Sequence, residues 1–415
     1  MKKPILKKII ILLLFFLPLF FTGCGIFLKP EKPQKPEPSA IKSKALKKLP
    51  LAQYPDFIDQ SDNQSLVNAI KQSLIYYNRI PEKMIFYFGK DFFCAKHIKK
   101  SIEIFLSFIE KNPTQKQLNQ FIRNNYLVYK ARGRKKDFKV FFTGYYEPFL
   151  LGSLIKNSEY IYPIYSKPWD LVSVDLSPFS SNYKKEPPFM ARVDNKKRLI
   201  PYYSRKEINS IKNFYKKAKP IVWVNNRIDR FFLEIQGSGI VKLKQGGFLR
   251  VHYHTSNGHP YKSIGRYLIN KNQITKKKMS MQAIRKWLKN NPLKIDEVLN
   301  YNPSFVFFKR EKHGPFGCLG VKVTPKRSIA TDKSIFPKGT LGFIKTFMPL
   351  KSEMEAPEKW KKYSGFVLNQ DTGGAIKGTG RADLFYGNGK YAEFAAGHMK
   401  HTGDLYFLVL KKAQL

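Results

Sequence analysis

Two aspartates, Asp371 and Asp383, enclose a glycine-rich stretch near the end of the sequence. The glycines predict repeated tight turns and close approach of the backbone. Asp383 is followed by Leu-Phe-Tyr, an apolar setting that would desolvate its carboxyl group and raise its pKa. A carboxylic acid whose pKa is raised toward neutrality is suited to donate a proton. The pattern indicates general acid chemistry at Asp383, and it is equally compatible with two aspartates that only stabilise turns.

The tripeptide Asp371-Thr372-Gly373 also matches the short signature of aspartic proteases. That class needs two such aspartates, which share one proton across two lobes or two chains. No second Asp-Thr-Gly or Asp-Ser-Gly occurs in the sequence. A protease would therefore have to be a dimer of unusually large subunits, and we disfavour this interpretation.

The hydrophobic periodicity indicates which elements position these aspartates. Residues 62–126 have apolar residues at helical spacing, and from residue 137 the period changes to two. Residues 150–270 are predicted to form a β domain, in which Phe231, Leu233 and Ile235 share one strand face. Helices are expected at 281–288 and 295–299, and short strands return from 305 onward.

The N-terminus is typical of a bacterial lipoprotein signal. A basic start is followed by an apolar run over 9–21, which is too short to span a bilayer comfortably and fits the core of a secretory signal. Residues 21–24, Phe-Thr-Gly-Cys, resemble a lipobox, so Cys24 would be acylated; an ordinary signal peptide with an incidental cysteine is the alternative. Residues 1–23 are then a signal peptide, and the Lys- and Pro-rich residues 24–50 are a stiff tether.

Several segments carry a family resemblance over roughly residues 140–410. They are 143–146, 162–165, 236–239, 257–265, 279–285, 302–308 and 371–387. In these segments the chain resembles the MltA family of membrane-bound lytic murein transglycosylases. The resemblance implies a mainly β fold with added helices: a double-psi β-barrel domain built from 51–148 and 271–415, and a smaller β domain inserted at 149–270, with the substrate groove between them.

The resemblance also implies the residues of the site. Asp383 would be the catalytic acid, and Asp371 and Asp332 would support it; one extra residue between Lys377 and Asp383 leaves the roles of Asp371 and Asp383 open to exchange. Pure turn stabilisation is the alternative for Asp371 and Asp332, and domain packing is the alternative for the two tyrosines of 143–146. The expected substrate-binding residues are Thr143, Tyr145, Tyr146, Gln236, Gly237, Ser238, Gly239, Tyr253 and Lys377.

The implied activity is cleavage of the β-1,4 bond between MurNAc and GlcNAc in peptidoglycan, as a lytic exotransglycosylase that uses one aspartate as acid and base. The product would be 1,6-anhydroMurNAc, and no metal or other cofactor is expected. The alternatives are a peptidoglycan-binding lipoprotein without catalysis and a hydrolytic muramidase. The expected partners are glycan strands, the membrane through the N-terminal lipid, and enzymes of wall synthesis or hydrolysis. Gly25, in place of the Asp that favours inner-membrane retention, fits the periplasmic face of the outer membrane.

The charge of the chain is strongly positive. Lys and Arg number 75 against 30 for Asp and Glu, which gives a formal net charge of +45. Such a charge favours polyanionic partners, among them anionic lipids, nucleic acid and the acidic stem peptides of peptidoglycan. The lysines are spread along the whole chain, so a compositional bias explains them as well, and no specific nucleic acid is expected. No disulfide is predicted between Cys94 and Cys318.

Overall fold

The computed structural model describes residues 40–133, 138–183, 186–350, 357 and 359–412. The signal peptide and the lipidation of Cys24 lie outside these residues and stay predictions. In the part of the chain that is described, no helix is long and apolar enough to cross a membrane. Cys94 and Cys318 are both free thiols.

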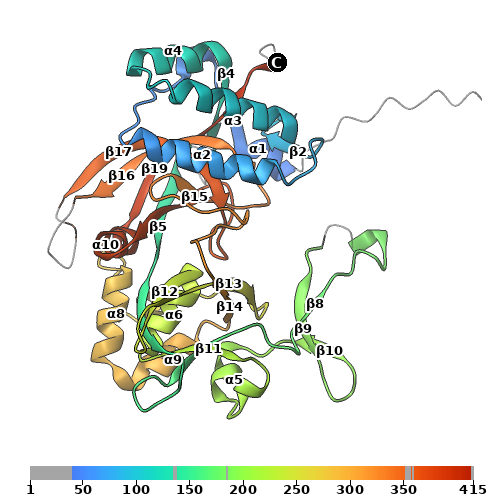
Figure 1. Ribbon diagram of the computed structural model, residues 1–415, viewed down its shortest axis with the longest axis vertical. Helices are drawn as coiled ribbons and strands as arrows, with labels where there is room; N and C mark the ends of the chain where they lie inside the picture. Colours follow the sequence, from blue (N-terminus) through green and yellow to red (C-terminus); the bar gives the residue numbers. More distant parts are fainter. Residues whose placement is uncertain (1–39, 134–137, 184–185, 351–356, 358, 413–415) are drawn as a thin grey trace, which may run out of the picture. The chain divides into compact units, whose positions relative to one another are not determined.

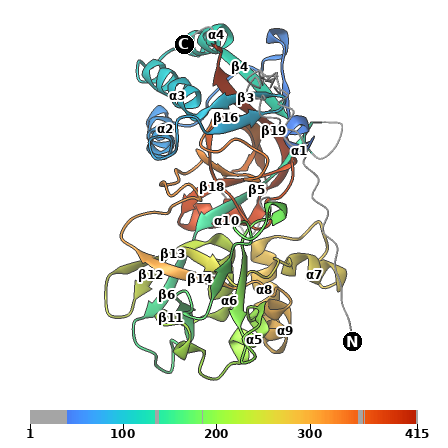
Figure 2. The same cartoon turned by 90° about the vertical axis from the view of Figure 1, so that its right-hand side faces the viewer.

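Six strands of the eight-stranded first sheet form a closed β-barrel, and β4 and β1 extend that sheet beyond β19. The order of the barrel strands is β19-β16-β17-β15-β18-β5, and pairing of β5 with β19 closes the ring. The pairs β15–β17 and β18–β5 are parallel and the others are antiparallel. Figure 2 shows several of these strands around the ring. The strands are β5 (Val140–Glu147), β15 (Ser328–Ala330), β16 (Leu341–Pro349), β17 (Trp360–Asp371), β18 (Arg381–Asn388) and β19 (Lys400–Leu410). The prediction of a mainly β fold with a closed barrel is confirmed.

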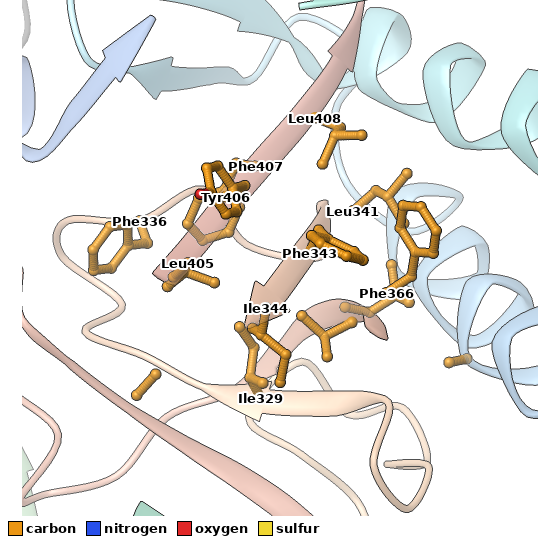
Figure 3. Packing of buried hydrophobic residues seen from close by; sticks show 14 of the residues in the cluster. Ile329, Phe336, Leu341, Phe343, Ile344, Phe366, Leu405, Tyr406, Phe407 and Leu408 are labelled. Carbon is orange, nitrogen blue, oxygen red and sulfur yellow. The ribbon is translucent and has the colours of Figure 1, made fainter. Parts of the chain in front are cut away.

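Large apolar side chains of the barrel strands pack in one buried cluster with the helices that cover them (Figure 3). Ile329, Phe343 and Phe366 are fully buried, and the rings of Phe343 and Phe366 lie 5.0 Å apart, centroid to centroid. Strands that bury such residues remove a large apolar area from water, which is the main driving force for packing the barrel against its helices. The packed core fixes the strands that carry the aspartates.

Helices and short strands surround this barrel (Figure 1). Helix α2 packs against β17 and α3 against β19, while α10 packs against β5 and β18. Asp62 caps the start of α2, and Thr114 forms a capping box with Gln117 at the start of α4. The elements are α1 (Ala40–Ala45), β1 (Leu46–Lys48), α2 (Asn63–Tyr77), β2 (Ile85–Phe88), β3 (Asp91–Cys94), α3 (Ala95–Ile109), α4 (Gln115–Asn125), β4 (Tyr126–Ala131) and α10 (Lys390–His398).

A second, six-stranded sheet has the order β14-β13-β12-β6-β11-β7, and a separate three-stranded sheet has the order β10-β9-β8. Only Pro148 separates β5 of the barrel from β6 of the second sheet. The strands are β6 (Phe149–Ser153), β7 (Tyr162–Tyr165), β8 (Val172–Val174), β9 (Phe189–Val193), β10 (Leu199–Pro201), β11 (Pro220–Val224), β12 (Ser238–Leu243), β13 (Phe248–Ser256) and β14 (Val306–Glu311). The helices are α5 (Arg205–Ser210), α6 (Arg227–Gln236), α7 (Ile264–Asn270), α8 (Met281–Asn290) and α9 (Ile295–Asn300).

The strand predicted at Phe231, Leu233 and Ile235 is wrong, because these residues lie in helix α6. The Asn226 side chain caps the helix by accepting hydrogen bonds from the next backbone amides, and Gly237 ends it with φ of 82°. Phe231 and Phe232, together with Ile228, pack at helical spacing in one apolar cluster. A short apolar run is compatible with both a helix and a strand. The capping residues at the two ends of the segment identify it as a helix.

Two predicted boundaries also differ from the observed pairing. The tether was expected to reach residue 50. Strand β1 pairs with β4, and Ala45 and Leu46 are buried, and this leads us to propose that the tether ends before residue 45. The inserted domain was expected to end at residue 270. Strand β14 pairs with β13, and this pairing leads us to propose that the insert extends through residue 311.

Candidate active site

The barrel pairing brings Asp371 and Asp383 to adjacent strands. In β15, Ala330 pairs with Asp371 of β17 on one side and with Asp383 of β18 on the other. On its other edge, β18 aligns Asp383 with Thr143 of β5. The short strand β15 thus lies between two strands that each carry a carboxyl group, and the two predicted aspartates meet at one place in the barrel.

Asp383 is half-buried and has a hydroxyl group as its hydrogen-bonding neighbour. Its Oδ1 accepts a hydrogen bond from Thr143 Oγ1. Arg381 Nη2 lies 3.5 Å from the same Thr143 oxygen. Burial raises the pKa of Asp383 to about 6; the Arg381 cation opposes this increase and the neighbouring Asp371 adds to it. Near neutral pH this carboxyl group therefore exchanges its proton readily.

Asp371 is held by N–H donors. Its Oδ1 accepts hydrogen bonds from the Thr372 amide at 2.8 Å and from the Cys318 amide at 2.9 Å. Burial raises the pKa of Asp371 to about 6, and the backbone amides and the Tyr145 hydroxyl lessen that rise. The buried Tyr145 hydroxyl lies near the carboxyl group of Asp371. Among the described residues, however, no group meets the geometry of a hydrogen bond with this hydroxyl.

The different partners of the two carboxyl groups distinguish them chemically. An amide N–H can only donate, so the two amides at Asp371 favour its ionised form. The Thr143 hydroxyl can donate to an ionised Asp383 or accept from a protonated one. Asp383 therefore keeps a partner in both protonation states, which is what a group that first gives and then takes a proton requires.

Asp332 holds the glycine-rich loop between β17 and β18. Its Oδ1 accepts from the Ser334 amide at 3.0 Å and hydroxyl at 2.6 Å, and its Oδ2 accepts from the Gly378 amide at 2.8 Å. Burial acts to raise its pKa, but these hydrogen bonds and the Lys377 cation outweigh it and lower the pKa. Gly378 has φ of 82°, a conformation that favours glycine. Asp332 thus acts on the loop, and Lys377 is exposed on it.

Predicted binding residues of β5 contact predicted binding residues at the end of α6. The Tyr146 amide donates to Gln236 Oε1 at 3.0 Å, and the Tyr146 hydroxyl donates to Glu393 at 3.2 Å. Tyr146 is only 3% exposed, which favours its packing role over stacking on a sugar. Gly237 ends α6, and Ser238 and Gly239 begin β12 as buried residues. Tyr253 on β13 is 43% exposed, so part of its side chain is open to a ligand.

Two site residues were missed as individual candidates. Arg381 precedes Asp383 by two positions on one strand, so both side chains leave the same face, and that spacing was a usable signal. Tyr261 follows β13, and burial raises its pKa; the charges of Arg381 and Asp383 also act on its hydroxyl. Tyr261 lies in a segment used for the resemblance, but nothing in its spacing pointed to the aspartates.

Comparison with known proteins gives consistent matches. Residues 141–309 match the family model of the MltA specific insert domain, and residues 327–409 match the 3D domain. Membrane-bound lytic murein transglycosylase A of Escherichia coli (strain K12) is 32% identical over 277 residues, which cover 64% of this chain and 65% of that protein. The match thus spans slightly less than two thirds of that relative.

Two further proteins extend this comparison. The membrane-bound lytic murein transglycosylase A homolog of Buchnera aphidicola subsp. Schizaphis graminum is 31% identical over 315 residues, 75% of this chain and 77% of that protein. The crystal structure of a membrane-bound lytic murein transglycosylase from Agrobacterium tumefaciens superposes with a TM-score of 0.72 and 25% identity, covering 89% of this chain and 98% of that one.

Proposed function

The chain belongs to the MltA family, and from this premise we propose that it is a lytic transglycosylase of peptidoglycan. The bond cleaved is the β-1,4 linkage between MurNAc and GlcNAc, and the product carries a 1,6-anhydroMurNAc end. The observation that carries the proposal is Asp383: a half-buried carboxyl group with a pKa of about 6, whose Thr143 partner serves both protonation states.

The reaction needs one carboxyl group used twice. Protonated Asp383 donates its proton to the oxygen between MurNAc and GlcNAc, the bond from that oxygen to C1 breaks, and the sugar passes through an oxocarbenium-like state. Ionised Asp383 then takes the proton of the C6 hydroxyl of the same MurNAc while that oxygen bonds to C1. The nucleophile is already tethered to the sugar, so effective molarity replaces an activated water and a second carboxylate.

The neighbours of Asp383 tune this cycle. Asp371 raises the pKa of Asp383 and so favours the donor state, whereas Arg381 lowers it and favours the ionised acceptor state. Asp371 is the positioning group, held by the Thr372 and Cys318 amides, and Asp332 fixes the glycine-rich loop. The glycan strand would lie between the barrel and the inserted domain, near Tyr261, on whose hydroxyl the charge of Asp383 acts.

The relatives are named membrane-bound, and association with a membrane follows from that name. We attribute it in this chain to a lipid on Cys24, with the enzyme at the periplasmic face of the outer membrane. Attack from the end of a glycan strand, with other enzymes of wall synthesis or hydrolysis nearby, is part of the same proposal.

Mass spectrometry of purified murein digested by the protein tests the proposal. Anhydro-muropeptides are expected; products heavier by one water would mean a muramidase, and no products would mean a binding protein. Asp383→Asn should lower product formation by roughly 10²- to 10⁴-fold, the range for loss of a general acid. Asp371→Asn is the matched control and should retain more activity. A dead Asp371→Asn beside a near-normal Asp383→Asn would reverse the two roles.

A further inference from the structure

A cavity of about 360 Å³ lies in the region of the second sheet, and none of its lining residues comes from the barrel strands. A volume of this size suits a small ligand or one group of a larger ligand. Aromatic rings form part of its wall, from Tyr162, Tyr165 and Trp223. Its charged lining residues are Lys156, Arg205, Lys212, Arg227, Arg230 and Asp296.

The cations of this cavity outnumber the anions that can neutralise them. Arg227 pairs with Asp296 at 2.7 Å. Arg205, which is 2% exposed, pairs with the buried Glu234 at 2.7 Å. Glu234 Oε2 also accepts from the Val306 amide. Arg230 also lies in ion-pair range of Glu234, at 3.9 Å, so two buried arginines share one carboxylate.

Arg230 is 9% exposed and incompletely satisfied. Its Nη2 donates to Asn209 Oδ1 at 2.9 Å, but among the described residues its Nε has no hydrogen-bond partner. Glu234 Oε1 lies 3.9 Å from that Nε, beyond hydrogen-bond distance, and is likewise unpartnered. A guanidinium does not lose its proton in a protein, so the buried positive charge persists and is costly unless an anion compensates it.

The entrance of the cavity adds positive charge and a flat apolar surface. Lys156 and Lys212 are exposed on the lining. The ammonium of Lys156 lies 5.5 Å from the centre of the Trp223 ring. A ligand that satisfies this site carries an anionic group for Arg230 and a small organic body for the aromatic wall. A carboxylate matches the planar fork of a guanidinium.

We propose that this cavity binds a carboxylate of the acidic stem peptides that substitute the glycan strands of peptidoglycan. This inference rests on the proposed function, because it takes peptidoglycan as the substrate and adds a second contact with it, separate from the aspartates. Arg230 receives the carboxylate, Lys156 and Lys212 attract it, and the aromatic wall contacts the peptide. A chain bound at two points would be held on the strand between successive cuts.

Titration calorimetry on the mature chain carrying Asp383→Asn tests this site without cleavage. The probe is N-acetyl-L-alanyl-D-glutamate, and the neutral control is the same compound with both carboxyls amidated. We expect saturable binding of the acid and none of the diamide. Arg230→Gln should weaken the affinity by roughly 10- to 100-fold, the loss of one charge-assisted contact in a buried site. Lys156→Gln with Lys212→Gln should weaken it by several-fold while leaving the fold intact.

The matched control is Arg198→Gln, which removes an exposed arginine paired with Asp194 outside the cavity and should leave the affinity unchanged. Equal binding by wild type and both cavity variants would overturn the proposal, as would inorganic phosphate binding more tightly than the acid at Arg230. This readout is independent of lysis: binding without anhydro products would end the proposed function alone, and products without binding would end only this inference.

Discussion

The barrel and the inserted region each bury two like-charged groups close together, with opposite outcomes. In the barrel, Asp371 and Asp383 relieve the conflict by holding protons, since burial raises both pKa values to about 6. In the cavity, Arg205 and Arg230 share one buried carboxylate, and neither can relieve the conflict by releasing a proton. Buried acids therefore make a proton-transfer site that pH adjusts, whereas buried arginines make a site that needs an anion.

The largest expected difference between the two sites is in how they respond to pH. In the proposed mechanism lytic activity needs protonated Asp383, so the activity should fall about tenfold per pH unit above 6, or roughly 10³-fold by pH 9. Affinity of the cavity for the acidic dipeptide should stay constant from pH 6 to 8, because guanidinium groups in proteins keep their charge and the carboxyl groups of the dipeptide are ionised over this range. Initial rates and calorimetry over one buffer series measure both. Parallel loss of both signals would mean that one titrating group governs both sites.

Neutralising each arginine in turn tests whether the cavity holds a surplus charge. Arg205→Met leaves Glu234 buried without its partner and should cost about 3–5 kcal/mol of unfolding free energy. Arg230→Met removes the second, more distant cation beside Glu234 and should cost about 1 kcal/mol or less without ligand. Urea unfolding measures both. Equal costs would show that Glu234 is shared evenly and that no surplus charge exists.

Neutralising each aspartate should stabilise the protein at neutral pH. The folded pKa of about 6 lies above the ordinary value of 3.8, so the folded state binds the proton more tightly than the unfolded chain. The resulting cost is absent below pH 3.8 and complete above pH 6. Asp371→Asn or Asp383→Asn should therefore add about 1–3 kcal/mol at pH 7.5 and almost nothing at pH 4. Denaturant unfolding curves at both pH values measure this change in the free energy of unfolding. A variant that is less stable than the wild type at pH 7.5 would contradict the raised pKa.

The smallest effect concerns the link between the aspartates. Tyr145 lowers the pKa of Asp371, and Asp371 raises that of Asp383. Tyr145→Phe should therefore leave Asp371 neutral more often, weaken its repulsion of Asp383, and move the alkaline limb of the pH profile down by roughly a few tenths of a unit. Tyr183→Phe, at an exposed tyrosine outside both sites, is the control. An upward shift would mean that the hydroxyl acts on Asp383 itself.

The sequence predicted the barrel better than the inserted region. The alternation of apolar residues around Val140 and Phe142, and the aspartates that flank glycines, are local sequence patterns. Tertiary packing does not change the structure that such patterns predict. Around Phe231 the local pattern fitted both helix and strand, and only the caps at Asn226 and Gly237 separated them. The resemblance carried the assignment of Asp383, since two aspartates around a glycine loop equally fit a turn.

The cavity had no signal in the sequence at all. Arg205 begins α5, Arg230 lies within α6, and Asp296 lies in α9, so tertiary packing alone brings them together. In a chain with 75 basic residues, no single arginine stands out. Burial and the lack of a partner distinguish Arg230, and both are properties of the folded structure.

The last strand of the barrel has a consequence for the order of assembly. Strand β19 closes the ring by pairing with β5, and it also pairs with β4 and β16, so two of its partners lie more than 250 residues before it in the sequence. During synthesis or export, most of the chain emerges before the ring can shut, and such distant pairings form slowly. An emerging chain of this design would close the ring that carries Asp371 and Asp383 only after Lys400–Leu410 has arrived, so the candidate site would be complete late in synthesis.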